Sequence, residues 1–404
     1  MLGSWIPLTV TLSIQALVSV AALTLPVLAP AVAPTLGVTP ALVGVYVAIV
    51  YIGATFSTLG GGSAVTRFGA IRVSQAGLVL CAAGLALSTL AELPAVAAGA
   101  FLIGLGYGPM TPASSHLLAR TTPPERLSLV FSVKQTGVPL GGVIAGAVVP
   151  GLTLAVGWQA ALWVIALACL ACAFAAQPIR PGLDADRDPT APLTLSNLAR
   201  TLGLVLRHPV LRLLAACSFV FSLTQNSLSG YLVTYLEDAL AYGLVVAGAA
   251  LSLAQLGGVA GRIFWGWVAD RWLGAQRMLL GLALLMSLSA VATAVLQAWM
   301  PAALVSLVLL VFGASAIGWN GVYLAEVARQ APPGQASLAT GGTLAFTFFG
   351  VVIGPPIFGA VSALTGSYRT GFWGLAILTA LCAAVLLRVV WRSAAAARGT
   401  GAGN

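Results

Sequence analysis

The chain has 404 residues, of which 59% are hydrophobic and only 7% are charged, and its formal net charge is +9. Soluble domains carry roughly a quarter of charged residues, so this composition, with a mean hydropathy of +1.02, excludes a soluble globular domain and a disordered chain. It also excludes a nucleic-acid-binding protein with a solvated basic face. Seventeen of the 18 basic residues are Arg, and their scattered placement is typical of the rim of a membrane protein.

Apolar segments of near-spanning length follow one another along the whole chain. Residues 1–66 contain no charged residue. As one helix they would extend about 100 Å, whereas the hydrocarbon core of a bilayer is about 30 Å thick. The stretch must therefore turn back, and Pro34, Gly37 and Pro40 mark the turn.

The same reasoning, applied to each polar break in turn, predicts an all-α membrane protein with twelve transmembrane helices. The predicted spans are residues 6–34, 42–65, 73–91, 95–119, 127–150, 157–178, 211–236, 243–268, 278–297, 301–327, 337–363 and 370–391.

One long polar stretch, residues 179–209, separates six spans from six spans. It contains Asp184, Asp186 and Asp188 together with several prolines, and it is too short to bury a core of its own. We therefore predict an N-terminal six-helix bundle over 1–178, a cytoplasmic linker over 179–209, and a C-terminal six-helix bundle with a short cytoplasmic tail over 210–404.

Arginine placement predicts the orientation. With both termini in the cytoplasm, nearly all loop arginines lie on the cytoplasmic side, and the outer loops carry only Arg369 together with Glu92, Glu237 and Asp238. This asymmetry follows the positive-inside rule. It predicts an integral protein of the bacterial inner membrane with both termini inside.

The loops after the second and eighth spans resemble each other. The first contains Gly62, Arg67, Gly69 and Arg72, and the second contains Gly266, Asp270, Arg271 and Gly274. Weak symmetry between two six-span halves is typical of transporters built from repeats.

At these residues the chain resembles the major facilitator superfamily, whose signature is Gly-x-x-x-Asp-Arg-x-Gly-x-Arg-Arg between spans two and three, echoed between spans eight and nine. The resemblance implies two six-helix bundles of the major facilitator fold. It also implies a conformational latch between them. Its predicted residues are Gly62, Arg67, Gly69, Arg72, Gly266, Asp270 and Arg271. Two departures stand out, because Thr66 occupies the place of the first Asp and one extra residue precedes Gly274.

Two cations, Lys134 and Arg262, fall inside predicted spans, where a charge is costly and commonly functional. No carboxylate in a span is available to neutralise either one, so the missing negative charge is predicted to be the substrate. Two alternatives stay open: Lys134 can extend to the cytoplasmic surface, and Arg262 can pair with Asp270 or with helix-end carbonyls.

The neighbourhood of Lys134 favours close helix packing. Gly137 and Gly141 share its helix face, and small residues at this spacing admit a second helix. The segment 134–142, which includes Pro139, also resembles the Gly/Pro-rich fifth-span motif of the superfamily.

Uncharged polar residues inside the spans complete the predicted substrate site. The candidates are Gln135, Gln225, Asn226, Asn320, Tyr107 and Trp319, whose amides and ring donors can bind a ligand's oxygens; hydrogen bonding between helices is the alternative role. Further polar candidates for the cavity wall are Gln15, Tyr46, Tyr51, His116, Tyr231, Gln255 and Tyr323.

No catalytic triad, phosphate-binding Gly-Lys-Ser/Thr loop or His/Cys ligand cluster occurs in the sequence, so we predict no enzyme activity, no cofactor and no metal. The expected function is secondary transport of a small organic anion, a monocarboxylate in particular, by alternating access and coupled to protons or a counter-anion. We expect a monomer in the lipid bilayer that does not bind nucleic acid. The Arg262 segment also resembles that of monocarboxylate transporters and of the oxalate–formate exchanger, although the exchanger's second cation, in span eleven, is missing here.

Two other functions stay open. A proton-coupled exporter of drug-like or other small solutes would need an acid in the cavity, and a non-transporting membrane sensor would need a soluble signalling domain.

Overall fold

The computed structural model describes residues 5–123, 126–194, 198–332 and 335–401, and its regular elements are helices. Their bounds are α1 (Trp5–Val27), α2 (Ala29–Val32), the 3₁₀ turn η2 (Pro40–Leu42), α3 (Val43–Phe68), α4 (Ala70–Ser88), α5 (Leu93–Tyr107), α6 (Met110–Thr121), α7 (Leu127–Gln135), α8 (Gly137–Val156), α9 (Trp158–Ala175), α10 (Arg180–Leu183), α11 (Leu198–Arg207), α12 (Pro209–Leu240), α13 (Leu244–Val268), the π-helical turn η4 (Ala269–Leu273), α14 (Ala275–Ala294), α15 (Ala302–Ala316), α16 (Asn320–Gln330), α17 (Ala336–Thr365) and α18 (Tyr368–Gly401).

Eleven helical segments of the described chain are long and apolar enough to cross a membrane. The predicted span 211–236 corresponds to α12, which is 32 residues long but carries Thr224, Gln225 and Asn226 at its centre. These polar residues lower its hydropathy, and α12 accordingly falls outside the eleven. The predicted all-α membrane fold is confirmed, and the length of α12 is consistent with the predicted count of twelve spans.

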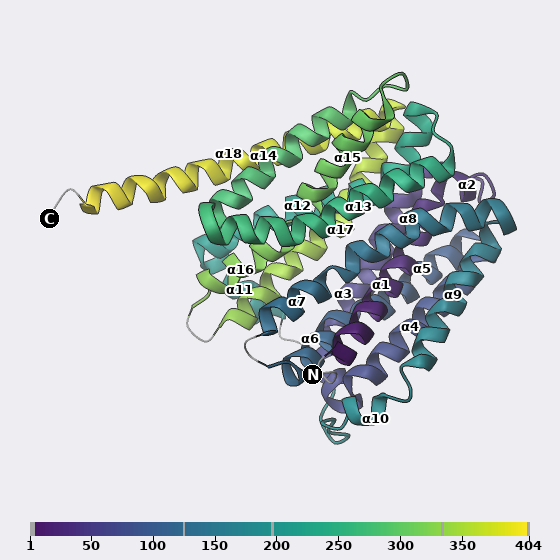
Figure 1. Ribbon diagram of the computed structural model, residues 1–404, viewed down its shortest axis with the longest axis horizontal. Helices are drawn as coiled ribbons and strands as arrows, with labels where there is room; N and C mark the ends of the chain where they lie inside the picture. The colour runs from purple at the N-terminus through teal and green to yellow at the C-terminus, as the bar shows by residue number, and fades with distance from the viewer. Residues whose placement is uncertain (1–4, 124–125, 195–197, 333–334, 402–404) are drawn as a thin grey trace.

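The helices form two groups that lie side by side (Figure 1). We call α1–α9 the N half and α12–α18 the C half. Across their boundary α8 packs against α13, and α3 packs against α17. We call the end of the bundle at which α10 and α11 lie the linker end, and the opposite end the far end (Figure 1).

Three predicted spans are interrupted rather than continuous. Residues 95–119 form α5 and α6, residues 127–150 form α7 and α8, and residues 301–327 form α15 and α16. The first two breaks lie close to Pro109 and Pro139, each of which lacks the N–H that a continuous helix requires. The first span is also shorter than predicted, because α1 ends at Val27, just after Pro26.

The extra residue before Gly274 is absorbed by a π-helical turn. In the first loop Gly69 N donates to Val65 O at 2.8 Å, four residues back, whereas Gly274 N donates to Ala269 O at 2.8 Å, five residues back. A π turn accommodates one additional residue without changing the direction of the helix. The two loops are therefore structurally similar despite their unequal lengths.

At the far end the halves touch through main-chain atoms. A Cβ built on Gly146 of α8 would lie 2.5 Å from Gly248 O of α13, so only glycine permits this crossing. The Tyr231 hydroxyl of α12 lies 2.6 Å from Ala41 O and 3.0 Å from Pro355 O, and it accepts from Gly44 N at 2.9 Å. These contacts join the two halves at the far end.

The first part of the linker binds the N half. The Asp184 carboxylate is 3% exposed and accepts hydrogen bonds from Ile71 N at 2.8 Å and Arg72 N at 3.0 Å. It thereby satisfies the first free N–H groups of α4, a role that the residue preceding a helix commonly fills. That residue is Gly69, whose φ of 96° and lack of space for a Cβ against Asp184 both require glycine.

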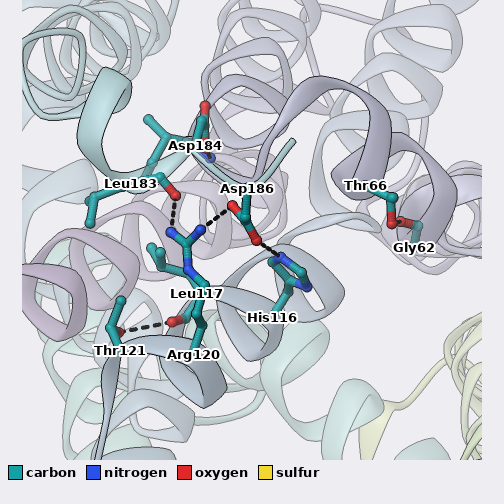
Figure 2. A network of polar contacts seen from close by, with 10 residues as sticks. Gly62, Thr66, His116, Leu117, Arg120, Thr121, Leu183, Asp184 and Asp186 are labelled. Atoms are coloured by element: carbon teal, nitrogen blue, oxygen red, sulfur yellow. Dashed lines mark hydrogen bonds and ion pairs between the residues drawn. The ribbon is translucent and has the colours of Figure 1, made fainter. Parts of the chain in front are cut away.

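A second linker acid binds α6. Figure 2 shows the Asp186 carboxylate between His116 and Arg120. Asp186 Oδ2 lies 2.6 Å from His116 Nε2. The Arg120 guanidinium pairs with the same carboxylate and also donates to Leu183 O. Partial burial raises the pKa of the Asp186 carboxyl, but the His116 hydrogen bond and the Arg120 charge outweigh it, so the pKa lies below its ordinary value. The stabilisation from this acid is therefore present above the ordinary pKa and is lost as the pH falls towards the lowered one.

Substitution of Gly146 by Val should keep the halves apart at the far end, because the new side chain would overlap Gly248 O. Spin labels at the exposed positions Leu154 and Val246 would report this as a longer distance in double electron–electron resonance. Gly151→Val, on the same helix, meets no atom within 4 Å and should leave the distance unchanged. Equal spin-label distances in the two variants would show that the close contact between Gly146 and Gly248 O does not hold the halves together at the far end.

Replacement of Asp184 by Ala should lower the free energy of unfolding by about 1–2 kcal/mol, because two N–H groups at the start of α4 lose their acceptor. The thermal unfolding midpoint of the purified protein measures the effect. Asp188→Ala is the matched control, since Asp188 is an exposed linker acid whose carboxylate accepts hydrogen bonds from Thr190 within the linker. A midpoint for Asp184→Ala equal to that of the control would show that the cap contributes nothing.

Candidate functional site

Lys134 is buried where α7 ends. Its side chain is 1% exposed, and Nζ lies 3.4 Å from Gln135 Oε1. Gly137 and Gly141 of the same face pack against α1, where a Cβ on Gly141 would lie 2.4 Å from Ala16 O. The ammonium group therefore does not extend to the aqueous phase, and its face meets a neighbouring helix as the glycine spacing predicted.

Arg262 of α13 is bound by two main-chain carbonyls. Nη1 donates to Gln135 O at 2.6 Å, in the N half, and Nε donates to Ile317 O at 3.2 Å, in the C half. Both oxygens lie at helix ends, where carbonyls lack partners within the helix. The structure thus shows the helix-end alternative for Arg262 and not an ion pair with Asp270.

The two cations lie close enough to interact electrostatically across the boundary between the halves. In the described part of the chain, neither forms an ion pair. The ion pairs there join linker-end groups, namely His116 and Arg120 to Asp186, Arg180 to Asp184, and Arg329 to Glu326. Within the described residues, the hydrogen-bond acceptors of these two cations are therefore neutral oxygens.

A small cavity of about 40 Å³ lies between the two halves, and neither Lys134 nor Arg262 is among its lining residues. It is lined by Ser19, Ala22, Leu23, Val47, Val50, Tyr51, Tyr107, Val138, Gln225, Asn226, Ser229, Gly230 and Gln255. Ligand pockets usually measure about 300–1,000 Å³, so this space holds only a few water molecules. An organic substrate requires the helices around it to separate.

The predicted amides and the indole form one hydrogen-bonded group. Gln225 Oε1 accepts from Trp319 Nε1 at 3.0 Å and from Asn320 Nδ2 at 3.4 Å, which leaves the Gln225 amide nitrogen available to donate. Asn226 Nδ2 donates to Ser222 O at 3.0 Å. Gln225 and Asn226 line the cavity, and Asn320 and the buried Trp319 are bonded to Gln225.

An aromatic pair lies next to Arg262. The ring centroids of Tyr51 and Tyr107 are 5.7 Å apart, and both residues interact electrostatically with the guanidinium. Phe348 of the C half lies 6.3 Å from Tyr51. Sequence reasoning missed Phe348, Ser19 and Ser229. Ser19 lies one helical turn from Gln15, and this spacing was the only available signal.

The predicted latch residues lie at the linker end and are not brought together as one group. Arg67 Nη1 donates to Ala191 O of the linker at 3.4 Å, and Arg72 N binds Asp184. No atom lies within 4 Å of a Cβ built on Gly62 or Gly266. Asp270 and Arg271 are exposed on η4, and within the described residues neither forms an ion pair.

Comparison with known proteins agrees with this architecture. A family model described as the Major Facilitator Superfamily matches residues 11–342. The gentisate transporter of Corynebacterium glutamicum is 27% identical over 372 residues, which cover 88% of this chain and 79% of that protein.

Solved structures show the same fold. A bacterial homologue of the human lysosomal transporter Spinster, in an inward-facing and occupied conformation, superposes with a TM-score of 0.76 at 13% identity, covering 94% of this chain and 95% of that one. A peptide transporter, POT, in complex with sulfate gives 0.77 at 16% identity, covering 96% and 94%. From the family match over most of its length and the shared fold, the chain belongs to the Major Facilitator Superfamily of membrane transporters.

Proposed function

We propose that this protein transports a small organic anion, in particular a monocarboxylate, and that Arg262 and Lys134 bind its carboxylate. The observation that carries the proposal is that two cations from opposite halves interact electrostatically while no acid among the described residues pairs with either one. Removing charges from water is costly unless an opposite charge compensates. A carboxylate supplies that charge, and a guanidinium fork matches its two oxygens.

The surrounding groups favour a ring-bearing acid. Tyr51 and Tyr107 line the cavity and interact electrostatically with Arg262, and Gln225 offers an amide donor in the same lining. Such a wall suits a hydroxylated aromatic acid, whose ring packs on aromatic side chains while its hydroxyls form hydrogen bonds. The similarity to a gentisate transporter supports this substrate class.

The proposed cycle is a rocking of the two halves about the site. Glycine crossings and Tyr231 join them at the far end, and the bond from Arg262 to Gln135 joins them between the cavity and the linker end. Because the loops at the linker end carry most of the arginines, we assign that end to the cytoplasm of a bacterial inner membrane. Opening at either end would then expose the cations to one aqueous phase at a time.

The driving force comes from protons that accompany the substrate or from a counter-anion. The residues that line the cavity include no Asp or Glu, so a carboxylate proton carrier of the kind that a cationic-drug exporter needs is missing from this wall. A pH gradient imposed on proteoliposomes, compared with preloading of an unlabelled acid, distinguishes the two sources.

Replacement of Arg262 by Ala should lower the uptake of labelled benzoate or gentisate into proteoliposomes about 10- to 100-fold, the value of a charge-assisted hydrogen bond. Lys134→Ala should reduce uptake in the same direction. Arg262→Lys should retain part of the activity, because the charge stays while the fork is lost.

Arg369→Ala is the matched control. Its guanidinium also binds a helix-end carbonyl, Ala294 O at 2.9 Å, but it belongs to the start of α18 and has no part in the proposed anion site, so uptake should stay at the parent level. If both Arg262→Ala and Lys134→Ala transport the acids at the parent rate, the cations do not bind the substrate and the proposal fails.

A further inference from the structure

The carbonyl of Gln135 lacks a helical partner because of a residue four positions along the chain. In a continuous helix the N–H of residue 139 would donate to this oxygen. Pro139 has no N–H, and the helix is interrupted there, with α7 ending at Gln135 and α8 beginning at Gly137. The freed oxygen accepts the 2.6 Å bond from Arg262 Nη1.

The second carbonyl at Arg262 is also a helix-end group. Helix α15 ends at Ala316, and Ile317 O accepts from Arg262 Nε. The last carbonyls of a helix carry partial negative charge and stabilise a nearby cation. Arg262 is thus stabilised by the ends of two helices, one in each half, without an acid that would cancel its charge.

Another proline in this chain has the same effect. Pro112 leaves Gly108 O without its helical donor, and Thr58 Oγ1 of α3 donates to that oxygen at 3.0 Å. The use of a proline-freed carbonyl by a side chain of another helix therefore occurs twice within the N half, once with a hydroxyl and once with the guanidinium.

We propose that Pro139 is a positioning residue for substrate binding, which it achieves by making the Gln135 carbonyl available to orient Arg262. This inference rests on the proposed role of Arg262 in binding the anion. A guanidinium has five N–H donors, and the two carbonyls use two of them, which leaves three for a carboxylate. The fork keeps its full charge and is fixed in direction before the anion arrives.

The arrangement also makes the orientation of Arg262 depend on both halves. Ile317 moves with Arg262 in the C half, whereas Gln135 belongs to the N half. When the halves separate at the linker end, the Gln135 bond is lost and the Ile317 bond remains. Binding should therefore be strongest while the halves are in contact around the site.

The test compares variants that have an N–H group at position 139 with variants that lack it. Pro139→Ala supplies it and lets the helix continue, so the Gln135 carbonyl turns along the helix axis. Incorporation of lactic acid at position 139 gives the same side chain through an ester, which has no N–H. With benzoate as the probe, the Kd measured by calorimetry should rise about tenfold for the Ala variant and stay near the parent value for the ester variant.

Two controls separate this effect from misfolding and from loss of the anion site. Pro150→Ala removes another proline of α8, far from Arg262, and should leave the Kd unchanged. If Pro139→Ala does not fold, an ester that replaces the peptide bond between Gln135 and Thr136 weakens the same carbonyl as an acceptor while retaining Pro139, and it should raise the Kd several-fold.

The outcomes distinguish the two levels of the proposal. A parent-like Kd for both Pro139→Ala and the 135–136 ester, with binding lost in Arg262→Ala, would overturn the positioning role and leave the anion site intact. Retention of benzoate binding in Arg262→Ala would overturn the proposed function itself. Equal weakening by Pro139→Ala and by the lactic acid variant would assign the effect to the proline ring and not to the N–H.

Discussion

Two positive side chains in the interior of a membrane protein require compensating negative charge, and the part of the chain that the structure describes offers them only neutral oxygens. Lys134 contacts an amide and Arg262 contacts two carbonyls. Carbonyl dipoles reduce the cost of burying the cations but do not neutralise them. The breaks in the interrupted spans supply the carbonyls that bind Arg262. The packing of α8 against α13 brings the two halves together around these groups. In the function proposed above, a bound anion would complete the electrostatic balance, and its departure would restore the imbalance.

The spans could be predicted because spanning length, loop arginines and proline breaks are local properties of the sequence. The cations could be singled out for the same reason, since a charge in an apolar run is visible without a structure. Their partners could not, because Gln135 and Arg262 are 127 residues apart and meet only through the crossing of two helices. Pro139 was visible as a helix breaker, but which donor would take the freed carbonyl depends on the packing of the other half.

The loop after the second span shows a similar limit. Thr66 stands there in place of the acid of the superfamily signature. The structure places a different acid, Asp184 of the linker, at the start of α4, and Asp188 N donates to Thr66 O at 2.8 Å. The compensation comes from 113 residues away, beyond any local pattern. Conversely, the requirement for glycine at position 69 follows from the neighbouring acid as much as from the backbone angle.

The fastening of the linker to the N half sets a mechanical limit on the transport cycle. Thr194 is tied to Ser63 by two hydrogen bonds, of 2.7 and 3.1 Å, and α11, which begins at Leu198, packs against α17 of the C half. Four peptide units between these anchor points can extend to about 14 Å at most. This short covalent connection limits how far the two halves can separate on that side. A longer connection would allow a larger separation without changing any residue of the proposed substrate site.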